Sequence, residues 1–331
     1  MAQNGEYGKE LEQRTMKCFS IDLGGTHAAC GLVEDDRILA SETLNVEDAG
    51  SLAGILPRLA ESLKRLNGGM IPQGGEVSGV AIGLPVIVDF YRGKALGSNG
   101  KYIDADKVDL QSWGLESLGL PLFAENDARM ALLGEAYAGA GRGFENIVMI
   151  TLGTGIGGVA MIEGKLLRGK HAQAGCIGGH LPVKVEGRKC TCGAVGCAEA
   201  EASGWALPLL VKEWPDIKDS SLRRYENIGF RELFSEAARG DRVACEIRDH
   251  CLRVWATVTV GLVHAYDPEI VIFGGGVMKS ADIILPYIKS HVHKYAWTPW
   301  GKVEVRAAEL GDNAALLGGI PMVSHAKPLS G

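Results

Sequence analysis

Three cysteines lie within eight residues of this chain, in the stretch "KCTCGAVGCAEAEASG" that begins at Lys189. They are Cys190, Cys192 and Cys197, and His180 precedes the first of them by ten residues. Three thiolates and one imidazole form a donor set that binds zinc tetrahedrally. Four protein ligands leave no open position for water, so the sequence predicts a structural zinc site and not a catalytic one. The alternative is a group of free thiols without metal.

An acidic side chain supplies the second candidate for chemistry, in the stretch "AENDARMALLGEAYAG". Glu125, Asn126 and Asp127 stand at the end of a predicted strand, and a helix is expected to run from there to about Gly139. Asp127 can act as a general base that takes the proton from a hydroxyl attacking a phosphoryl group. The alternative is that Asp127 only caps the helix, a role worth about 1 kcal/mol.

Two glycine-rich turns follow predicted strands. The first contains Gly24, Gly25 and Thr26 after Asp22, and the second contains Gly153, Thr154 and Gly155. Such turns let backbone amides approach phosphate oxygens closely, and each adds a threonine hydroxyl. Asp22 could assist a Mg²⁺ ion held against nucleotide phosphates. Alternatively, both turns are simple tight hairpins.

Residues 153–158 also match the G-x-G-x-x-G pattern, which alone is a weak sign of a nicotinamide dinucleotide site. Such a site needs a helix directly after the glycines and an acidic residue about 20 positions on. Here a strand-like run follows the glycines, and position 178 is glycine. The context therefore argues against a dinucleotide site and favours phosphate binding by a hairpin.

The elements that would position these residues repeat along the chain. Hydrophobic patterning predicts strands and helices in both halves, with Pro57 as an imperfection in the first helix. The predicted strands are 17–21, 28–33, 38–44, 77–84, 146–152, 159–162 and 269–273, and the predicted helices are 51–66, 245–266 and a closing helix 313–323 interrupted near Pro321. Two units of strand, glycine turn and strand predict two related α/β domains that face each other across a cleft.

Composition and charge limit the classes of partner that this protein is expected to bind. The 331 residues are 46% hydrophobic and carry a net charge of -6, without a basic run that would bind nucleic acid. No window approaches the ~18 apolar residues that span a bilayer, and the N-terminus lacks the apolar core of a secretory signal. We expect a cytoplasmic protein that binds small molecules. In that reducing compartment, clustered cysteines favour metal binding over disulfides.

Six motifs together make the chain from Lys17 onward resemble the ROK group (repressors, open reading frames, kinases) of bacterial sugar kinases, within the actin-like ATPase superfamily. They are "DLGGT", "ENDA", "LGTGIGG", "CTCGAVGCAEAEASG", "FGGGV" and "LGDNAALLGG". The resemblance implies an α/β fold of two actin-like (ribonuclease H-like) lobes, with mixed sheets flanked by helices and a cleft between them. It also implies ATP with Mg²⁺, a structural zinc and phosphorylation of a hexose or N-acetylhexosamine, commonly at the 6-hydroxyl. Homo-oligomers are common in the family, so a homodimer or homotetramer is the expected assembly.

The resemblance also implies roles for individual residues and a division of the chain. Asp127 would be the catalytic base, and the zinc ligands would be His180, Cys190, Cys192 and Cys197. Sugar contacts would come from Asn99, Asn126, Asp127, His180 and Glu199, and ATP contacts from Asp22, Gly24, Gly25, Thr26, Gly153, Thr154, Gly155, Gly275 and Gly276. We expect a flexible leader (1–15), an N-terminal lobe (16–125), a C-terminal lobe (126–312) with zinc loop 180–197, and a final helix at about 313–328 that packs with the first lobe.

Departures from the family pattern lie where sugar is recognised. The family commonly has Glu-x-Gly-His, whereas this chain reads "AGCIGGH", with Cys176 in the glutamate position and one added residue before His180. A thiol is a weak acceptor for sugar hydroxyls. The usual Pro-Gly also reads Pro85-Val86. These changes leave the sugar open and raise the alternative of a catalytically impaired, sugar-binding regulatory protein. A DNA-binding repressor is not expected, because 16 residues before Lys17 are too few for a helix-turn-helix domain.

Overall fold

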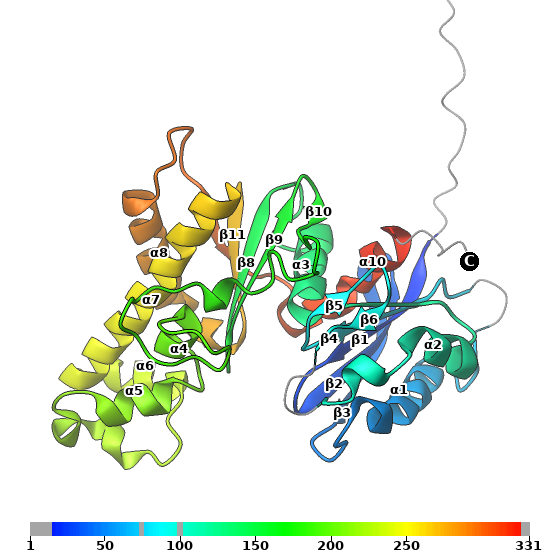
Figure 1. Cartoon of the computed structure of the whole chain (residues 1–331), viewed down its shortest axis with the longest axis horizontal. Helices are drawn as coiled ribbons and strands as arrows, with labels where there is room; N and C mark the ends of the chain where they lie inside the picture. Colours follow the sequence, from blue (N-terminus) through cyan, green and yellow to red (C-terminus); the bar gives the residue numbers. More distant parts are fainter. Residues whose placement is uncertain (1–14, 73–75, 98–101, 326–331) are drawn as a thin grey trace, which may run out of the picture.

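Two five-stranded sheets form the framework of the computed structural model, which describes residues 15–72, 76–97 and 102–325 (Figure 1). The first sheet has the order β3-β2-β1-β4-β7, with β1 (Lys17–Leu23), β2 (His27–Glu34), β3 (Arg37–Asn45), β4 (Val80–Leu84) and β7 (Leu122–Asn126). The second has the order β10-β9-β8-β11-β12, with β8 (Ile147–Leu152), β9 (Ile156–Ile162), β10 (Lys165–Leu166), β11 (Ile270–Gly274) and β12 (Glu304–Ala307). A small hairpin pairs β5 (Val88–Asp89) with β6 (Lys94–Ala95).

The two sheets have the same topology. In each, three antiparallel strands are followed by two strands that pair in parallel, so the predicted duplication of the strand, glycine turn and strand unit is confirmed. The returning strand after the second turn starts at Ile156, earlier than the expected residue 159. Gly157 and Gly158 pair with Thr151 and Ile150, so these glycines belong to the sheet and the turn itself is only three residues long.

Helices cover both faces of the sheets. They are α1 (Leu52–Leu66), α2 (Leu110–Leu118), α3 (Asp127–Ala138), α4 (Ala198–Ala202), α5 (Leu207–Glu213), α6 (Phe230–Ala238), α7 (Arg242–Tyr266), α8 (Ala281–Tyr295), α9 (Ala314–Leu317) and α10 (Gly319–His325). β4 and β11 are buried at every position, as expected for parallel strands covered on both faces. Ser51 caps α1, and the helix continues through Pro57.

Helix α3 lies between the two sheets and contributes to the core of both. Met130 packs with the first sheet and α9, whereas Leu132 packs with β8, β9 and β11. Gly134 allows the close crossing with α9, since a Cβ atom there would lie 1.9 Å from the carbonyl oxygen of Ala314. In Figure 1, α3 stands beside β8, β9 and α10, between the two halves of the molecule. The first residue of α3 is therefore held from both sides.

The closing helix is interrupted at Gly318 and not near Pro321, which corrects the expectation. A Cβ atom at Gly318 would lie 2.0 Å from the carbonyl oxygen of Met130, so the chain can pass α3 there only as glycine. Pro321 is the third residue of α10, in a first turn whose N–H groups need no helical partner. Both α9 and α10 contact β1 and β2.

Other expectations about the chain lie beyond these observations. Residues 1–14 of the predicted leader 1–15, and also Asn99, are outside the described residues, and the lobe boundary at residues 125–126 stays a prediction. Among the helices in the described part of the chain, none is long and apolar enough to cross a bilayer.

Candidate functional site

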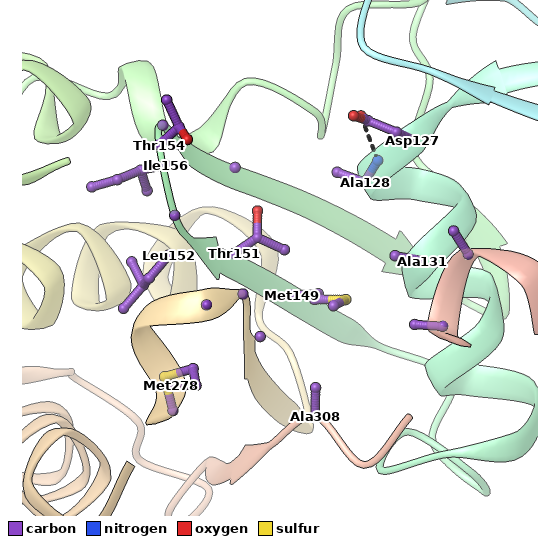
Figure 2. Close-up of a pocket in the computed structure, with 18 of the residues that line it drawn as sticks. Asp127, Ala128, Ala131, Met149, Thr151, Leu152, Thr154, Ile156, Met278 and Ala308 are labelled. Atoms are coloured by element: carbon purple, nitrogen blue, oxygen red, sulfur yellow. Dashed lines mark hydrogen bonds between the residues drawn. The ribbon is translucent and has the colours of Figure 1, made fainter. Parts of the chain in front are cut away.

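A cavity of about 680 Å³ opens between the two sheets and is lined by residues of both. The first sheet and its neighbours contribute Asp22, Asn126, Asp127 and Asp312. The second contributes the turn 153–155, the run Gly274–Gly276 and Glu199. Figure 2 shows Asp127 at the start of α3, with Thr154 and Met278 on the elements across from it. The cavity thus gathers one residue or more from each of the six sequence motifs.

Asp127 is the first residue of α3 but does not cap it. The cap is Asn126, whose Oδ1 accepts the N–H of Arg129 at 3.2 Å, so the alternative that Asp127 serves as the N-cap is wrong. Asp127 Oδ1 accepts the N–H of Ala128 at 2.7 Å and Nδ2 of Asn126 at 3.0 Å. Gly83 on β4 gives room for this arrangement, since a Cβ atom there would lie 3.2 Å from Asp127 Cα. The carboxylate is fixed in orientation and faces the cavity.

Negative charge accumulates around the cavity. Burial raises the pKa of the Asp127 carboxyl to about 6, against the opposing effect of its hydrogen bonds. Burial also raises the pKa of Asp22 to about 7, and the charges of Asp127 and Asp312 raise it further. Because the charges of two neighbouring carboxylates disfavour ionisation of Asp22, a cation bound there would stabilise the site.

The two glycine turns differ in position. Gly153, Thr154 and Gly155 line the cavity, and the N–H groups of Gly204 and Trp205 bind the turn through the carbonyls of Gly153 and Thr154. Gly24, Gly25 and Thr26 are not among the lining residues, although Asp22 is. The Gly24 N–H donates to His27 O at 2.9 Å, and its carbonyl accepts the hydroxyl of Tyr102. Phosphate contacts from this first turn stay a prediction.

Glu199 lies on α4, where it supports the second glycine turn. Its Oε2 accepts the N–H of Ile156 at 3.0 Å, and its Oε1 accepts the indole N–H of Trp205 at 3.2 Å. A Cβ atom at Gly155 would lie 2.6 Å from the same carboxylate. Glu199 therefore lines the larger cavity beside the turn, whereas His180 lines the smaller cavity described next, and the expected sugar contact of Glu199 stays a prediction.

A smaller cavity of about 330 Å³ shares Asn126 and Cys176 with the larger one. His180 and Ile177 line it, together with apolar residues around the β5-β6 hairpin: Pro85, Val86, Ile87 and Leu96. The Cys176 thiol lies 3.3 Å from the carbonyl oxygen of Gln173, a partner in its own loop. Both departures from the family pattern, Cys176 and Val86, therefore line the same cavity.

The predicted zinc ligands come together. One ligand atom from each of His180, Cys190, Cys192 and Cys197 lies within 4.8 Å of the others. The Sγ atoms of Cys192 and Cys197 are 3.7 Å apart, and Cys190 Sγ is 3.4 Å from His180 Nδ1. Tetrahedral Zn–S bonds of about 2.3 Å would place two sulfurs about 3.8 Å apart, so the donor set fits the ion.

Glycine makes this loop possible. Gly196 has a φ of +74°, and a Cβ atom there would lie 1.7 Å from the carbonyl oxygen of Lys184. Gly193, with a φ of +94°, donates its N–H to Cys190 O. The turns at these two positions bring Cys190, Cys192 and Cys197 to the same side of the loop.

Sequence reasoning missed several lining residues. Asp312 was inside the quoted motif "LGDNAALLGG" but received no role, and Thr151 precedes the second glycine turn. Lys279 and Met278 come from the short 3₁₀ helix Gly276–Ser280 that follows β11. A lone lysine after a glycine run carries no specific signal, so only the fold could reveal it. Gly275 and Gly276 line the cavity as expected.

Comparison with known proteins identifies relatives along nearly the whole chain. The model of the ROK family matches residues 18–326. A glucokinase of Thermotoga maritima is 34% identical over 317 residues, covering 94% of this chain and 98% of the relative. The crystal structure of a ROK hexokinase from Thermus thermophilus has a TM-score of 0.76 at 30% identity, covering 94% of this chain and all of that one.

A third match contains ligands. The ROK family glucokinase from Streptomyces griseus, in complex with glucose and AMPPNP, has a TM-score of 0.74 at 29% identity and covers 94% of this chain and 100% of that one. The fold with two mixed sheets, as expected from the motifs, agrees with these structures. The chain belongs to the ROK family.

Proposed function

We propose that this protein transfers the γ-phosphoryl group of ATP to a hydroxyl of a hexose or N-acetylhexosamine, with the 6-hydroxyl as the expected acceptor. The observation that carries the proposal is the position of Asp127. Asp127 lines the cavity that contains the glycine turn, and its neighbour Asn126 lines both this cavity and the smaller one. The glucokinases among the relatives support the same reaction.

Each cavity would bind one of the two substrates. The larger one would hold ATP, with phosphates near Gly153, Thr154 and Gly155 and the adenosine near Gly275 and Gly276. The smaller one would hold the sugar, with His180 and Asn126 as its polar side chains. Because the two cavities share Asn126, the acceptor hydroxyl and the γ-phosphate would meet beside Asp127.

Asp127 then acts as the general base. It accepts the proton of the acceptor hydroxyl as that oxygen bonds to the γ-phosphorus, while the bond from phosphorus to the bridging oxygen breaks and ADP leaves. A pKa of about 6 keeps Asp127 ionised at neutral pH and still basic enough to take a proton. Its hydrogen bonds to Ala128 and Asn126 keep the carboxylate aimed at the cavity.

Two metal ions are part of the proposal. Asp22 and Asp312 supply oxygen atoms that fit a hydrated Mg²⁺, and that ion would offset the charge of the nucleotide phosphates. His180, Cys190, Cys192 and Cys197 would hold a structural zinc. The zinc loop reaches both cavities, since His180 lines the smaller one and Glu199, two residues after Cys197, supports the glycine turn.

A coupled assay of ADP release tests the proposal on glucose, fructose, mannose, allose, N-acetylglucosamine and N-acetylmannosamine. We expect turnover with at least one sugar and its loss in Asp127→Asn. The alternative is a sugar-binding protein without catalysis, which Cys176 in the sugar cavity favours. Calorimetric binding of a sugar with no turnover on any of the six would support that alternative.

A further inference from the structure

Two segments far apart in sequence wall the smaller cavity. Residues 85–97, which include the β5-β6 hairpin, contribute Val86, Ile87 and Leu96. Residues 176–180 contribute Cys176, Ile177 and His180. The third contribution is Asn126, at the end of β7. The shape of this cavity therefore depends on whatever holds these three pieces at a fixed separation.

Arg168 connects the elements that carry these three pieces. It belongs to the loop after β10 that leads to Cys176. Its Nε and Nη2 atoms lie 2.8 and 2.7 Å from Oε2 of Glu125, the residue before Asn126. Its guanidinium carbon lies 4.3 Å from the ring centroid of Phe90, at the tip of the hairpin. One side chain thus links the loop, the hairpin and the strand end.

Burial strengthens these contacts. The Glu125 side chain is fully buried, and that of Arg168 is only 16% exposed. The ion pair of Arg168 with one carboxylate oxygen and the stacking of its guanidinium on an aromatic ring are both stronger when water is excluded. Glu125 Oε1 also accepts the Asn126 N–H at 2.9 Å, so the same carboxylate that binds Arg168 bonds to the backbone of a cavity residue.

A second arginine fixes the loop to the same carboxylate. Arg129 is fully buried, lies 3.4 Å from Glu125 Oε1, and donates to the carbonyls of Leu167, Ala172 and Ala174. The loop is therefore already attached to α3 without Arg168. What Arg168 adds is the connection to the hairpin, because Phe90 contacts its guanidinium and not that of Arg129.

We propose that Arg168 is a positioning residue for the acceptor: bound to Glu125 and stacked on Phe90, it sets the distance between the two walls of the smaller cavity and thereby the fit of the sugar. The inference rests on the proposed function, in that the smaller cavity is taken as the sugar site. Neither Arg168, Glu125 nor Phe90 lines the larger cavity. We call the contacts of Arg168 with Glu125 and Phe90 the clamp. Loss of the clamp should therefore change the affinity for sugar and leave the affinity for ATP unchanged.

Arg168→Met tests the clamp, because methionine fills similar space without charge or planarity. We expect the KM and the calorimetric Kd for the best sugar to rise about tenfold, the typical loss for a desolvated cation-aromatic contact and its ion pair. The KM for ATP should stay within about twofold of the wild-type value. The ratio of kcat/KM values for the two best sugars should move closer to one. Arg168→Lys keeps the charge but not the flat fork, and should fall between wild type and Arg168→Met. The matched control is Arg92→Met, on the same hairpin and 80% exposed.

Phe90→Leu gives an independent test that leaves the Glu125 pair intact, in case Arg168→Met fails to fold. It should raise the KM for sugar several-fold. In a folded double variant that combines Phe90→Leu with Arg168→Met, the effects of the two substitutions on sugar binding should be less than additive. Equal losses of sugar and ATP affinity, or an unchanged sugar Kd in both variants, would overturn the inference. Sugar binding by the wild type without turnover would contradict the kinase proposal alone, since the Kd comparison would still test the clamp; binding of none of the six sugars would refute both.

Discussion

Replacing Asp22 by Asn should stabilise the protein in the absence of nucleotide and Mg²⁺. The carboxyl of Asp22 is buried beside Asp127 and Asp312, and its pKa rises from 3.8 to about 7. A folded-state pKa above the unfolded value means that the folded protein binds the proton more tightly. The group therefore stabilises the fold fully only below its unfolded pKa, and that stability is lost as the pH rises through about 7.

The size of the effect follows from the pKa. At about 1.4 kcal/mol per pH unit, the difference between the folded and unfolded pKa values of Asp22 corresponds to about 4 kcal/mol of destabilisation at pH 8. Asn is neutral and nearly the same size, so Asp22→Asn should recover about 2 to 4 kcal/mol there and less than half of that at pH 5. For a chain of this length, 1 kcal/mol changes Tm by about 2 °C, so the gain at pH 8 is several degrees.

Thermal unfolding at pH 5 and pH 8, without nucleotide or divalent cations, measures this directly. The matched control is Asp36→Asn, whose exposed ion pair with Arg142 at 3.8 Å should contribute less than about 1 kcal/mol at either pH. A Tm for Asp22→Asn that does not exceed the wild-type value at pH 8, or a gain of equal size at both pH values, would refute the reasoning. The same variant should use Mg-ATP poorly, because the charge that destabilises the empty cavity is the one proposed to face the cation.

Two further predictions concern the base and the metal. Because burial raises the pKa of Asp127 to about 6, kcat/KM for sugar at saturating Mg-ATP should fall on the acid side, by roughly tenfold between pH 7 and pH 5; a flat profile over that range would contradict the assignment. Zinc removal, or Cys192→Ser, should raise sugar KM at least about tenfold and more than ATP KM, since His180 lines the sugar cavity. Metal analysis confirms the loss of zinc, and an unchanged sugar KM in demetallated protein would refute the role given to the loop.

Local patterns predicted much of the fold. The strand, glycine turn and strand units were predictable because alternating apolar residues and glycines act over a few positions, and both units form as expected. The four zinc ligands were predictable for the same reason, as three of them lie within eight residues. The helix break was misplaced because its cause is the carbonyl of Met130, a long-range neighbour of Gly318 that no local pattern reveals.

The site was only partly predictable, because tertiary contacts decide which motif residues face the cavity. Glu199 was expected to contact the sugar, which stays a prediction, and no local pattern reveals that its carboxylate bonds to the N–H of Ile156 at the glycine turn. Asp312 joins Asp22 only because α9 packs on β1 and beside α3. Arg168 carries no motif at all, and its importance comes from contacts with Glu125 and Phe90, which are 43 and 78 positions away.

The central claim is that Asp127 takes the proton of the acceptor hydroxyl, and the kinetics of Asp127→Asn test it most directly. With saturating Mg-ATP and the best sugar, kcat should fall by 10² to 10⁴, the usual contribution of a general base. Calorimetric affinities for sugar and nucleotide should stay within about threefold of the wild type, because asparagine keeps the shape of the side chain. A variant that binds both ligands normally and retains more than a tenth of the wild-type kcat would contradict the account.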